Sequence, residues 1–277
     1  MSDVEKNVRN FYDSFGWQIR NGVPGEDLFR QFSRPHFSYQ QAVNDRTAEC
    51  FSNLSGRLLF AGGGDLPESH TTIGEQFREI CCLDISRRAL EIAETKLGTK
   101  AEYIHGSILD IPLPNDYFDA AYCAHVIYHI DIDLQEKAIE ELIRVTKPGG
   151  RVVVIYANPD SLIDRIIENK RKLPLLWRLR RREKSLSQGS TESKSGRPPL
   201  YFALHSLQWW QRFDTKCHVS LIPWYVMSSA YEKELLWSDG MAAVAYRMCS
   251  WLEKKHPGLA VRWWQYPVII LEKRPTH

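Results

Sequence analysis

A regular alternation of short apolar runs and longer amphipathic stretches begins near residue 55 of this 277-residue chain. Five apolar runs have the length of buried strands: RLLFA (57–61), EICCLDI (79–85), AEYIHG (101–106), a run within YFDAAYCAHVIY (117–128) and RVVVIYA (151–157). The stretches between them include PESHTTIGEQF, SRRALEIAETKL and LQEKAIEELIRVT, which have apolar residues at helical spacing. Ser86 is the expected N-cap of the second helix, and Lys147–Gly150 is expected to end the third. Strands that alternate with helices predict parallel strands joined by right-handed crossovers.

We therefore expect an α/β fold with a doubly wound, mostly parallel, seven-stranded Rossmann-like sheet. HSLQWWQRF (205–213) predicts a further helix, and KCHVSLIPW (216–224) and WWQYPVIILEK (263–273) predict the last two strands. The predicted organisation is an N-terminal helical lid at 1–50, a core at 51–157, a basic and partly flexible insertion at 158–205, and a segment at 206–277 that completes the sheet. Helical insertions are expected after the fifth and sixth strands.

Composition narrows the class of protein. Hydrophobic residues make up 43% of the chain and charged residues 25%, which is typical of a globular protein rather than a disordered one. No apolar run is long enough to span a membrane, and the polar start MSDVEKNVRN does not resemble a signal peptide. The six cysteines form no CxxC pair, so we expect reduced, buried thiols in a cytoplasmic protein without a metal site.

Three consecutive glycines, Gly62, Gly63 and Gly64, follow the first predicted strand. Glycine lets backbone amides approach a ligand closely, although a glycine run can also be an ordinary tight turn. Asp84 ends the second predicted strand, where an acid can accept hydrogen bonds from both hydroxyls of an adenosine ribose. The alternative for Asp84 is a helix-capping acid, and its position after a strand favours the ribose role.

Five stretches in this order resemble class I S-adenosylmethionine-dependent methyltransferases, in particular the quinone and small-molecule enzymes. They are VRNFYDSFGW, LLFAGGGDL, CLDISRRALEIA, HGSILDIPLPNDYFDAAYCAHVIYHI and LIRVTKPGGRVVVIY. The resemblance implies S-adenosylmethionine as the cofactor. It implies a cofactor pocket made by Gly62, Gly63, Gly64, Asp65, Asp84, Ile85, Ser107, Ile108 and Ala124, with Arg46 as a candidate partner of the cofactor carboxylate or an ordinary surface arginine.

The chain departs from the family pattern at three positions. Phe60 stands where the family has an acid, Leu66 where it has the last glycine of the loop, and Ser107 where an acid contacts adenine. Asp65 could partly replace the first missing acid. The Ser107 hydroxyl can still accept a hydrogen bond, more weakly than a carboxylate.

Candidate catalytic residues cluster after the fourth predicted strand, in AHVIYHID. His125 and His129 could remove a proton from an acceptor, or be structural histidines. A metal site of these two with Asp131 and Asp133 is disfavoured because no known ligand spacing supports it. Tyr12 could close over the cofactor, or belong to an ordinary amphipathic helix.

These observations favour methyl transfer to a small-molecule or lipid-like acceptor, anionic or amphiphilic, at oxygen. Residues 165–184 carry nine basic residues against two acids, which could mean a peripheral membrane contact, an RNA substrate or a solvated helix face. The alternatives are an RNA methyltransferase, with nucleic acid disfavoured as a partner, and a non-enzymatic binding protein on a degenerate methyltransferase fold. The sequence does not indicate the oligomeric state.

Overall fold

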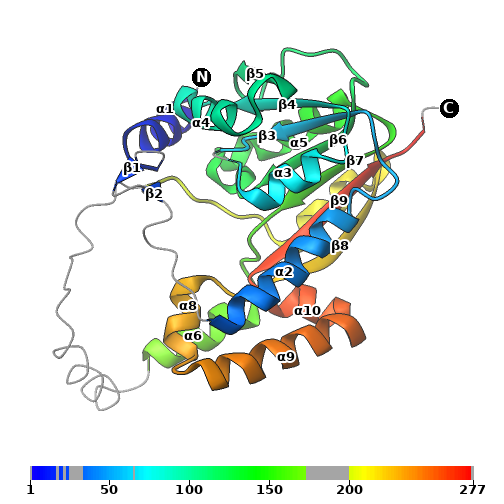
Figure 1. Ribbon diagram of the computed structural model, residues 1–277. Helices are drawn as coiled ribbons and strands as arrows, with labels where there is room; N and C mark the ends of the chain where they lie inside the picture. The colour runs from blue at the N-terminus through cyan, green and yellow to red at the C-terminus, as the bar shows by residue number, and fades with distance from the viewer. Residues whose placement is uncertain are drawn as a thin grey trace.

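A seven-stranded sheet forms the centre of the protein (Figure 1). The computed structural model describes residues 2–16, 19–20, 23–24, 34–64, 66–172 and 200–275. The strands are β3 (Arg57–Ala61), β4 (Glu79–Asp84), β5 (Ala101–His105), β6 (Phe118–Ala124), β7 (Thr146–Ile155), β8 (Cys217–Tyr225) and β9 (Tyr266–Lys273), in the spatial order β5-β4-β3-β6-β7-β9-β8. The first five are parallel to one another, and β9 is antiparallel to β7 and β8. The predicted mostly parallel sheet is confirmed.

The remaining elements also follow the expected order, with some differences in type and length. They are α1 (Asp3–Phe11), the π-helical turn η1 (Tyr12–Gly16), β1 (Ile19–Arg20), β2 (Val23–Pro24), α2 (Arg34–Glu49), α3 (Glu68–Gly74), α4 (Arg87–Leu97), η3 (Gly98–Lys100), η4 (Ile127–His129), η5 (Ile132–Leu134), α5 (Gln135–Val145), α6 (Leu162–Lys172), η6 (Leu207–Thr215), α8 (Ser229–Leu235), α9 (Asp239–Lys255) and α10 (Pro257–Trp263). Ser86 caps α4 as predicted, because its Oγ accepts a hydrogen bond from the Ala89 N–H. The predicted helix at 205–213 is a 3₁₀-helix, and β7 begins at Thr146 rather than after the KPGG turn.

Two hydrophobic clusters cover opposite faces of the sheet, and a third lies beyond one end of it. Residues of α5 and η6, such as Leu142 and Trp210, pack with one face. Residues of α3 and α4, such as Ile73 and Leu90, pack with the other. The third cluster joins α2, α8, α9 and α10 to the end of β8, including Tyr225. Figure 1 shows these helices gathered below the sheet, at the carboxyl ends of its parallel strands.

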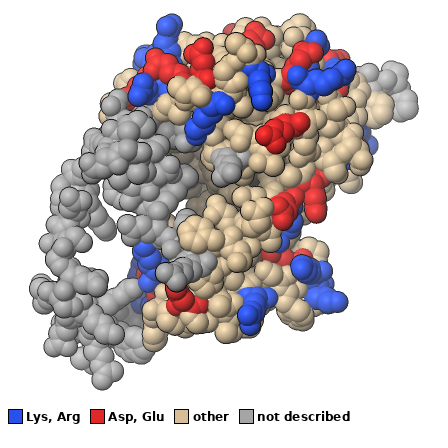
Figure 2. All heavy atoms as spheres, in the orientation of Figure 1, with Lys and Arg blue, Asp and Glu red and all other residues tan. Residues whose placement is uncertain are grey.

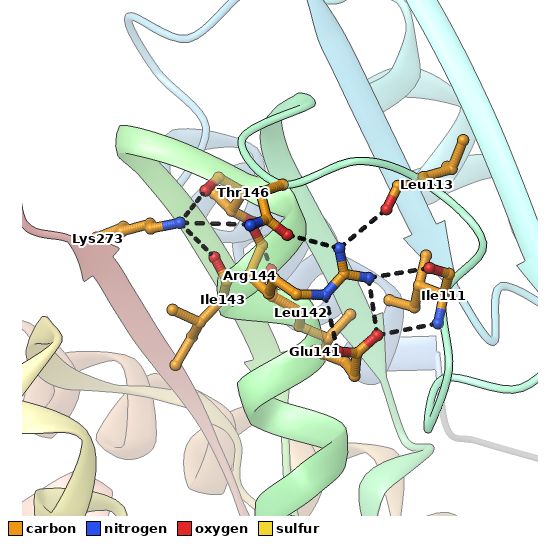
Figure 3. Close-up of polar contacts among 9 residues, drawn as sticks. Ile111, Leu113, Glu141, Leu142, Ile143, Arg144, Thr146 and Lys273 are labelled. Carbon is orange, nitrogen blue, oxygen red and sulfur yellow. Dashed lines mark hydrogen bonds and ion pairs between the residues drawn. The ribbon is translucent and has the colours of Figure 1, made fainter.

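A clamp of polar contacts holds the loop after β5 against α5 (Figure 3). The Arg144 guanidinium donates to the carbonyls of Ile111 and Leu113, each at 2.9 Å, and to both carboxylate oxygens of Glu141. Lys273 on β9 donates to the carbonyls of Ile143 and Thr146, and so covers the last carbonyls of α5. The loop that leads from β5 to β6 is therefore fixed to the body of the fold.

In the upper part of the view in Figure 2, Lys and Arg side chains are interspersed with Asp and Glu side chains. This mixture agrees with the formal net charge of only +2. All six cysteines are free thiols, and five of them are buried. Among the described residues, no helix has the length and apolar character needed to cross a bilayer. Residues 173–199 of the predicted basic and partly flexible insertion lie outside the described residues.

Candidate active site

The glycine loop leaves β3 at the carboxyl edge of the sheet, as its sequence predicts. The Gly62 N–H donates to the Leu83 carbonyl at 2.7 Å, which continues the pairing of β3 with β4 by one residue. Gly62 and Gly64 have φ values of +68° and +59°, which L side chains rarely adopt. A Cβ at Gly62 would lie 2.6 Å from Val126 Cγ2. Glycine is therefore required at Gly62 both for its conformation and for the close approach of the chain after β6.

Leu66 has a left-handed backbone conformation of the kind that favours glycine. Its φ is +49°, and its side chain is 1% exposed within the cluster that contains Phe60. Lys96 on α4 donates to the Leu66 carbonyl at 3.0 Å, which ties the end of the loop to α4. The residue that departs from the family pattern therefore packs into the core beside the loop and has a positive φ at this position. Asp65, predicted to contribute to this loop, lies outside the described residues.

Asp84 lies beside the glycine loop at the end of β4, where the sequence predicts it. Its Oδ2 accepts a 3.0 Å hydrogen bond from the Gly64 N–H, and its Oδ1 accepts one of 2.8 Å from the Ser86 N–H. The side chain is 8% exposed. Burial raises the pKa of Asp84 from its ordinary 3.8 to about 6, against the opposing effect of these backbone donors, and Asp13 raises it further. Asp84 is not the N-cap of α4, which is Ser86, so the capping alternative is wrong in that form.

Two carboxylates of the N-terminal segment reach the same edge, and sequence reasoning missed both. The Ser107 hydroxyl, after β5, donates to Glu5 Oε1 on α1, and the Ser86 hydroxyl donates to Asp13 Oδ1 on η1. Glu5 is 8% exposed. The only signal for Glu5 in the sequence is its place in a capping box with Ser2, which accounts for it as a local helix cap. A carboxylate therefore lies beside Ser107, at the position where the family has an acid.

The other predicted pocket residues are arranged around this edge with different exposures. Ile108 is buried in the core, and Phe60 is buried in a stack with the His70 ring. Ile85 and Ala124 are half-buried, at the ends of β4 and β6. Ile85 presents its carbonyl to the His105 ring at 3.1 Å. Phe60 thus fills with apolar packing the place where the family has an acid.

His129 and Tyr12 are brought together, although they are 117 residues apart in the sequence. Their ring centroids lie 6.3 Å apart, and the Phe202 ring lies 6.0 Å from His129. His129 Nδ1 lies 2.7 Å from the Tyr201 carbonyl. Because a carbonyl can only accept, Nδ1 must carry a hydrogen, and the basic lone pair of a neutral His129 is on Nε2. This tautomer is the one that can remove a proton through Nε2.

His125 occupies a different environment from His129. Its φ is +62°, and its Nδ1 lies 2.8 Å from the Tyr128 hydroxyl. Its ring packs against Trp224 and Tyr266, with centroids 5.1 and 5.4 Å away. The left-handed backbone and the aromatic packing give His125 a structural role at the end of β6, beside any role in chemistry.

Arg46 lies in the helical layer, and the structure does not support its predicted contact with a cofactor carboxylate. Its Nη1 is 2.6 Å from Glu253 Oε2 on α9, and its Nη2 donates to the Trp224 carbonyl at 3.1 Å. Glu253 is 5% exposed and also accepts from Tyr39 and Trp264. The alternative of an ordinary surface arginine is also wrong. Arg46 neutralises the buried Glu253, a long-range pairing that local sequence patterns do not reveal.

The donors and acceptors at this edge suit an adenosyl cofactor. Gly62 and Gly63 leave space that a Cβ would fill against Val126 and Leu66, and Asp84 and Glu5 are acceptors suited to ribose hydroxyls and an adenine amine. Among the residues that the structure describes, no group of three or more His, Cys, Asp or Glu could hold a metal ion.

Comparisons with known proteins agree with this geometry. Residues 61–154 match the family model of the methyltransferase domain. The ubiquinone/menaquinone biosynthesis C-methyltransferase UbiE of Francisella tularensis subsp. novicida is 31% identical over 103 residues, covering 35% of this chain and 40% of that protein. The chain spans less than half the length of the curated relatives that it matches first.

Solved methyltransferase structures share the fold over nearly the whole chain. One is the putative methyltransferase in complex with the Haloferax volcanii Trm112 activator, with a TM-score of 0.58, 13% identity and coverage of 98% of this chain and 99% of that one. Another is the N-methyltransferase NodS of Bradyrhizobium japonicum with S-adenosyl-L-homocysteine, with a TM-score of 0.52, 12% identity and coverage of 96% and 100%. Residues 61–154 thus match a methyltransferase domain, and the chain has the seven-stranded Rossmann-like fold of class I S-adenosylmethionine-dependent methyltransferases.

Proposed function

We propose that this protein transfers a methyl group from S-adenosylmethionine to a hydroxyl oxygen of a small, lipid-like acceptor. The observation that carries the proposal is the buried Asp84 carboxylate, which is bonded to the Gly64 N–H at the carboxyl edge of β3 and β4. Parallel α/β sheets bind their ligands at this edge. When bound, the cofactor supplies a methyl group on a sulfonium, so the protein has mainly to align the reactants.

The chain's own residues divide into a binding set and a proton-transfer set. Asp84 would accept hydrogen bonds from the ribose hydroxyls, Glu5 and Ser107 would contact the adenine, and Gly62–Gly64 would leave room for the methionyl part. His129 accepts the acceptor's hydroxyl proton on Nε2, while the Tyr201 carbonyl holds its Nδ1–H and stabilises the resulting imidazolium. Tyr12 covers this end of the site from the N-terminal segment.

A second candidate reaction is methylation at carbon. The curated relatives found by the comparison are named C-methyltransferases of quinone biosynthesis. Removal of a proton from a phenolic hydroxyl would also increase the electron density on the carbons of its ring. Methylation at carbon must then be followed by loss of the ring proton that the methyl group replaces, while the oxygen regains a proton. His129 would return its proton to the oxygen and accept the ring proton, so the same base would serve either reaction, and the product distinguishes them.

Calorimetric titration of S-adenosylhomocysteine into the wild type and Asp84→Ala tests the cofactor site. Micromolar binding to the wild type and its loss in Asp84→Ala are expected. Incubation with methyl-labelled cofactor and a panel of phenols and hydroquinones, with and without long alkyl tails, then tests the acceptor class, and NMR of the product locates the methyl group. Absence of S-adenosylhomocysteine binding to the wild type would contradict the proposal. If RNA added to the same assay were the only molecule labelled, the acceptor would be RNA rather than a small molecule.

A further inference from the structure

Helix α9 is held in place by one of its faces. Ala242, Tyr246 and Glu253 on this face are buried. The Tyr246 ring stacks on the Tyr39 ring of α2 with their centroids 4.7 Å apart, and Glu253 forms an ion pair with Arg46. These contacts fix the direction of the opposite face, which lies on the outside of the helical layer. Figure 1 shows α9 along the lower edge of the molecule, remote from the sheet.

The outer face of α9 is an exposed apolar stripe. Its members are Trp237, just before the helix, and Met241, Val244, Met248 and Trp251, whose exposed fractions are 74%, 36%, 56%, 66% and 58%. Successive members are three or four residues apart, a spacing that places side chains on one side of a helix. Single exposed apolar residues are common, but a row of five that includes two tryptophans indicates a contact surface.

The exposed charges from Asp239, the first residue of α9, to Arg262 are predominantly positive. They are Arg247, Lys254, Lys255 and Arg262 against Asp239, and the other acid in this range, Glu253, is buried in its pair with Arg46. Figure 2 shows Lys and Arg side chains along the same lower edge, with acidic side chains at its left end. An apolar stripe flanked by cations complements a surface that is apolar beneath and anionic on top.

We propose that the stripe of α9 docks on the surface of an anionic lipid bilayer. Amphipathic helices with aromatic and aliphatic residues on one face and basic residues beside it bind at the headgroup boundary, where tryptophan is favoured. A second copy fits less well, because a two-fold contact places the same patch on both sides and brings like charges together. The helical layer lies at the carboxyl edge of the sheet, so docking would turn that edge toward the bilayer, with the helical layer between them. The proposal does not depend on the methyltransferase assignment.

Co-sedimentation of the full-length protein with vesicles tests this surface. Phosphatidylcholine vesicles with a minor fraction of phosphatidylglycerol are compared with pure phosphatidylcholine vesicles. Wild-type protein should bind the anionic vesicles more strongly, and less so as salt is raised. Met248→Gln with Trp251→Gln should lower the partition coefficient about tenfold or more, since two apolar side chains are lost from the contact. Met248→Leu with Trp251→Phe, which keeps the stripe apolar, should stay within about twofold of the wild type.

Charge variants separate the two contributions. Lys254→Gln with Lys255→Gln should weaken binding to anionic vesicles by about fivefold for each lysine. Lys100→Gln, exposed on η3 in the sheet region, is the matched control and should leave binding unchanged. The proposal is overturned if the wild type does not bind anionic vesicles at low salt, or if the Met248/Trp251 glutamine variant binds them equally well. It is also overturned if sedimentation velocity shows a dimer that this variant dissociates while vesicles bind neither protein.

Discussion

The Gly64 N–H donates a 3.0 Å hydrogen bond to Oδ2 of the buried Asp84 carboxylate, so the glycine loop and the proposed ribose acceptor are physically joined. Because burial raises the pKa of Asp84 to about 6, this carboxyl changes charge in a range accessible to experiment. The ionised form accepts hydrogen bonds from two hydroxyls, whereas the protonated form has lost acceptor capacity. We expect S-adenosylhomocysteine to bind about tenfold more tightly at pH 7 than at pH 5, measured by calorimetry.

The same shift predicts the direction of a stability change. A raised carboxyl pKa means that the folded protein holds this proton more tightly than the unfolded chain. The stabilisation of the folded state by this proton is complete below pH 3.8 and is lost as the pH rises through about 6. The Asp84→Asn variant should lack this contribution in urea unfolding, and its weaker cofactor affinity should not vary with pH. Equal wild-type affinity at pH 5 and pH 7 would contradict the assignment.

His129→Asn separates proton transfer from structure. The asparagine amide can still donate to the Tyr201 carbonyl, as Nδ1 of His129 does, but it offers no basic nitrogen in the place of Nε2. We expect kcat to fall about a hundredfold or more with little change in S-adenosylhomocysteine affinity. Steady-state kinetics and calorimetry on the same preparation give both values. Retention of wild-type kcat would exclude His129 as the base.

Gly62→Ala should both destabilise the fold and abolish cofactor binding. An alanine here would have to adopt a φ of +68°, and its Cβ would lie 2.6 Å from Val126 Cγ2. The backbone strain and the steric clash together should lower the free energy of unfolding by roughly 2 to 5 kcal/mol. Gly98→Ala is the matched control, because Gly98 has φ +54° and no atom within 4 Å of its added Cβ. Its ψ of −130° lies in a region that L residues rarely adopt, so it should lose roughly 1 to 3 kcal/mol from its backbone conformation alone and retain binding. Equal losses in the two variants would show that the approach of Val126 is unimportant.

Glu5→Ala tests the contact of the N-terminal helix with the adenine end of the site. This change removes both the contact with Ser107 and half of the capping box, whereas Ser2→Ala removes only the side-chain cap. Both should destabilise α1 by about 1 kcal/mol. Glu5→Ala alone should weaken S-adenosylhomocysteine binding by about tenfold, the effect of losing a hydrogen bond to a charged group. An equal effect of both variants on affinity would assign Glu5 a capping role only.

Arg144→Ala should destabilise the fold through the loop that it holds. Arg144 donates to the carbonyls of Ile111 and Leu113 and pairs with Glu141, so the free energy of unfolding should fall by roughly 2 kcal/mol. Arg88→Ala is the matched control, because Arg88 forms an exposed pair with Glu91 within one helix turn. Arg88→Ala should change the free energy of unfolding by no more than about 0.5 kcal/mol. Urea denaturation of both variants measures the difference.

The order and type of most elements could be predicted from the sequence, because apolar periodicity and glycine turns are local properties. RLLFA, followed by Gly62, predicts a buried strand and its turn, and the structure has β3 at the same residues. Ser86 signals the start of α4 in the same way. Asp84 could be placed at the edge of the sheet because parallel strands bring their carboxyl ends together.

Only the tertiary structure decided which distant residues share an environment. Glu5 and Asp13 reach the site because α1 and η1 fold over the ends of β4 and β5, and Arg46 pairs with Glu253 because α2 packs on α9. A charged residue carries no local mark of its distant partner, since a pairing depends on the final position of both elements. The apolar stripe of α9 illustrates the same limit. Its apolar residues surround much of the helix, and only the packing of Tyr246 on Tyr39 determines which of them remain exposed.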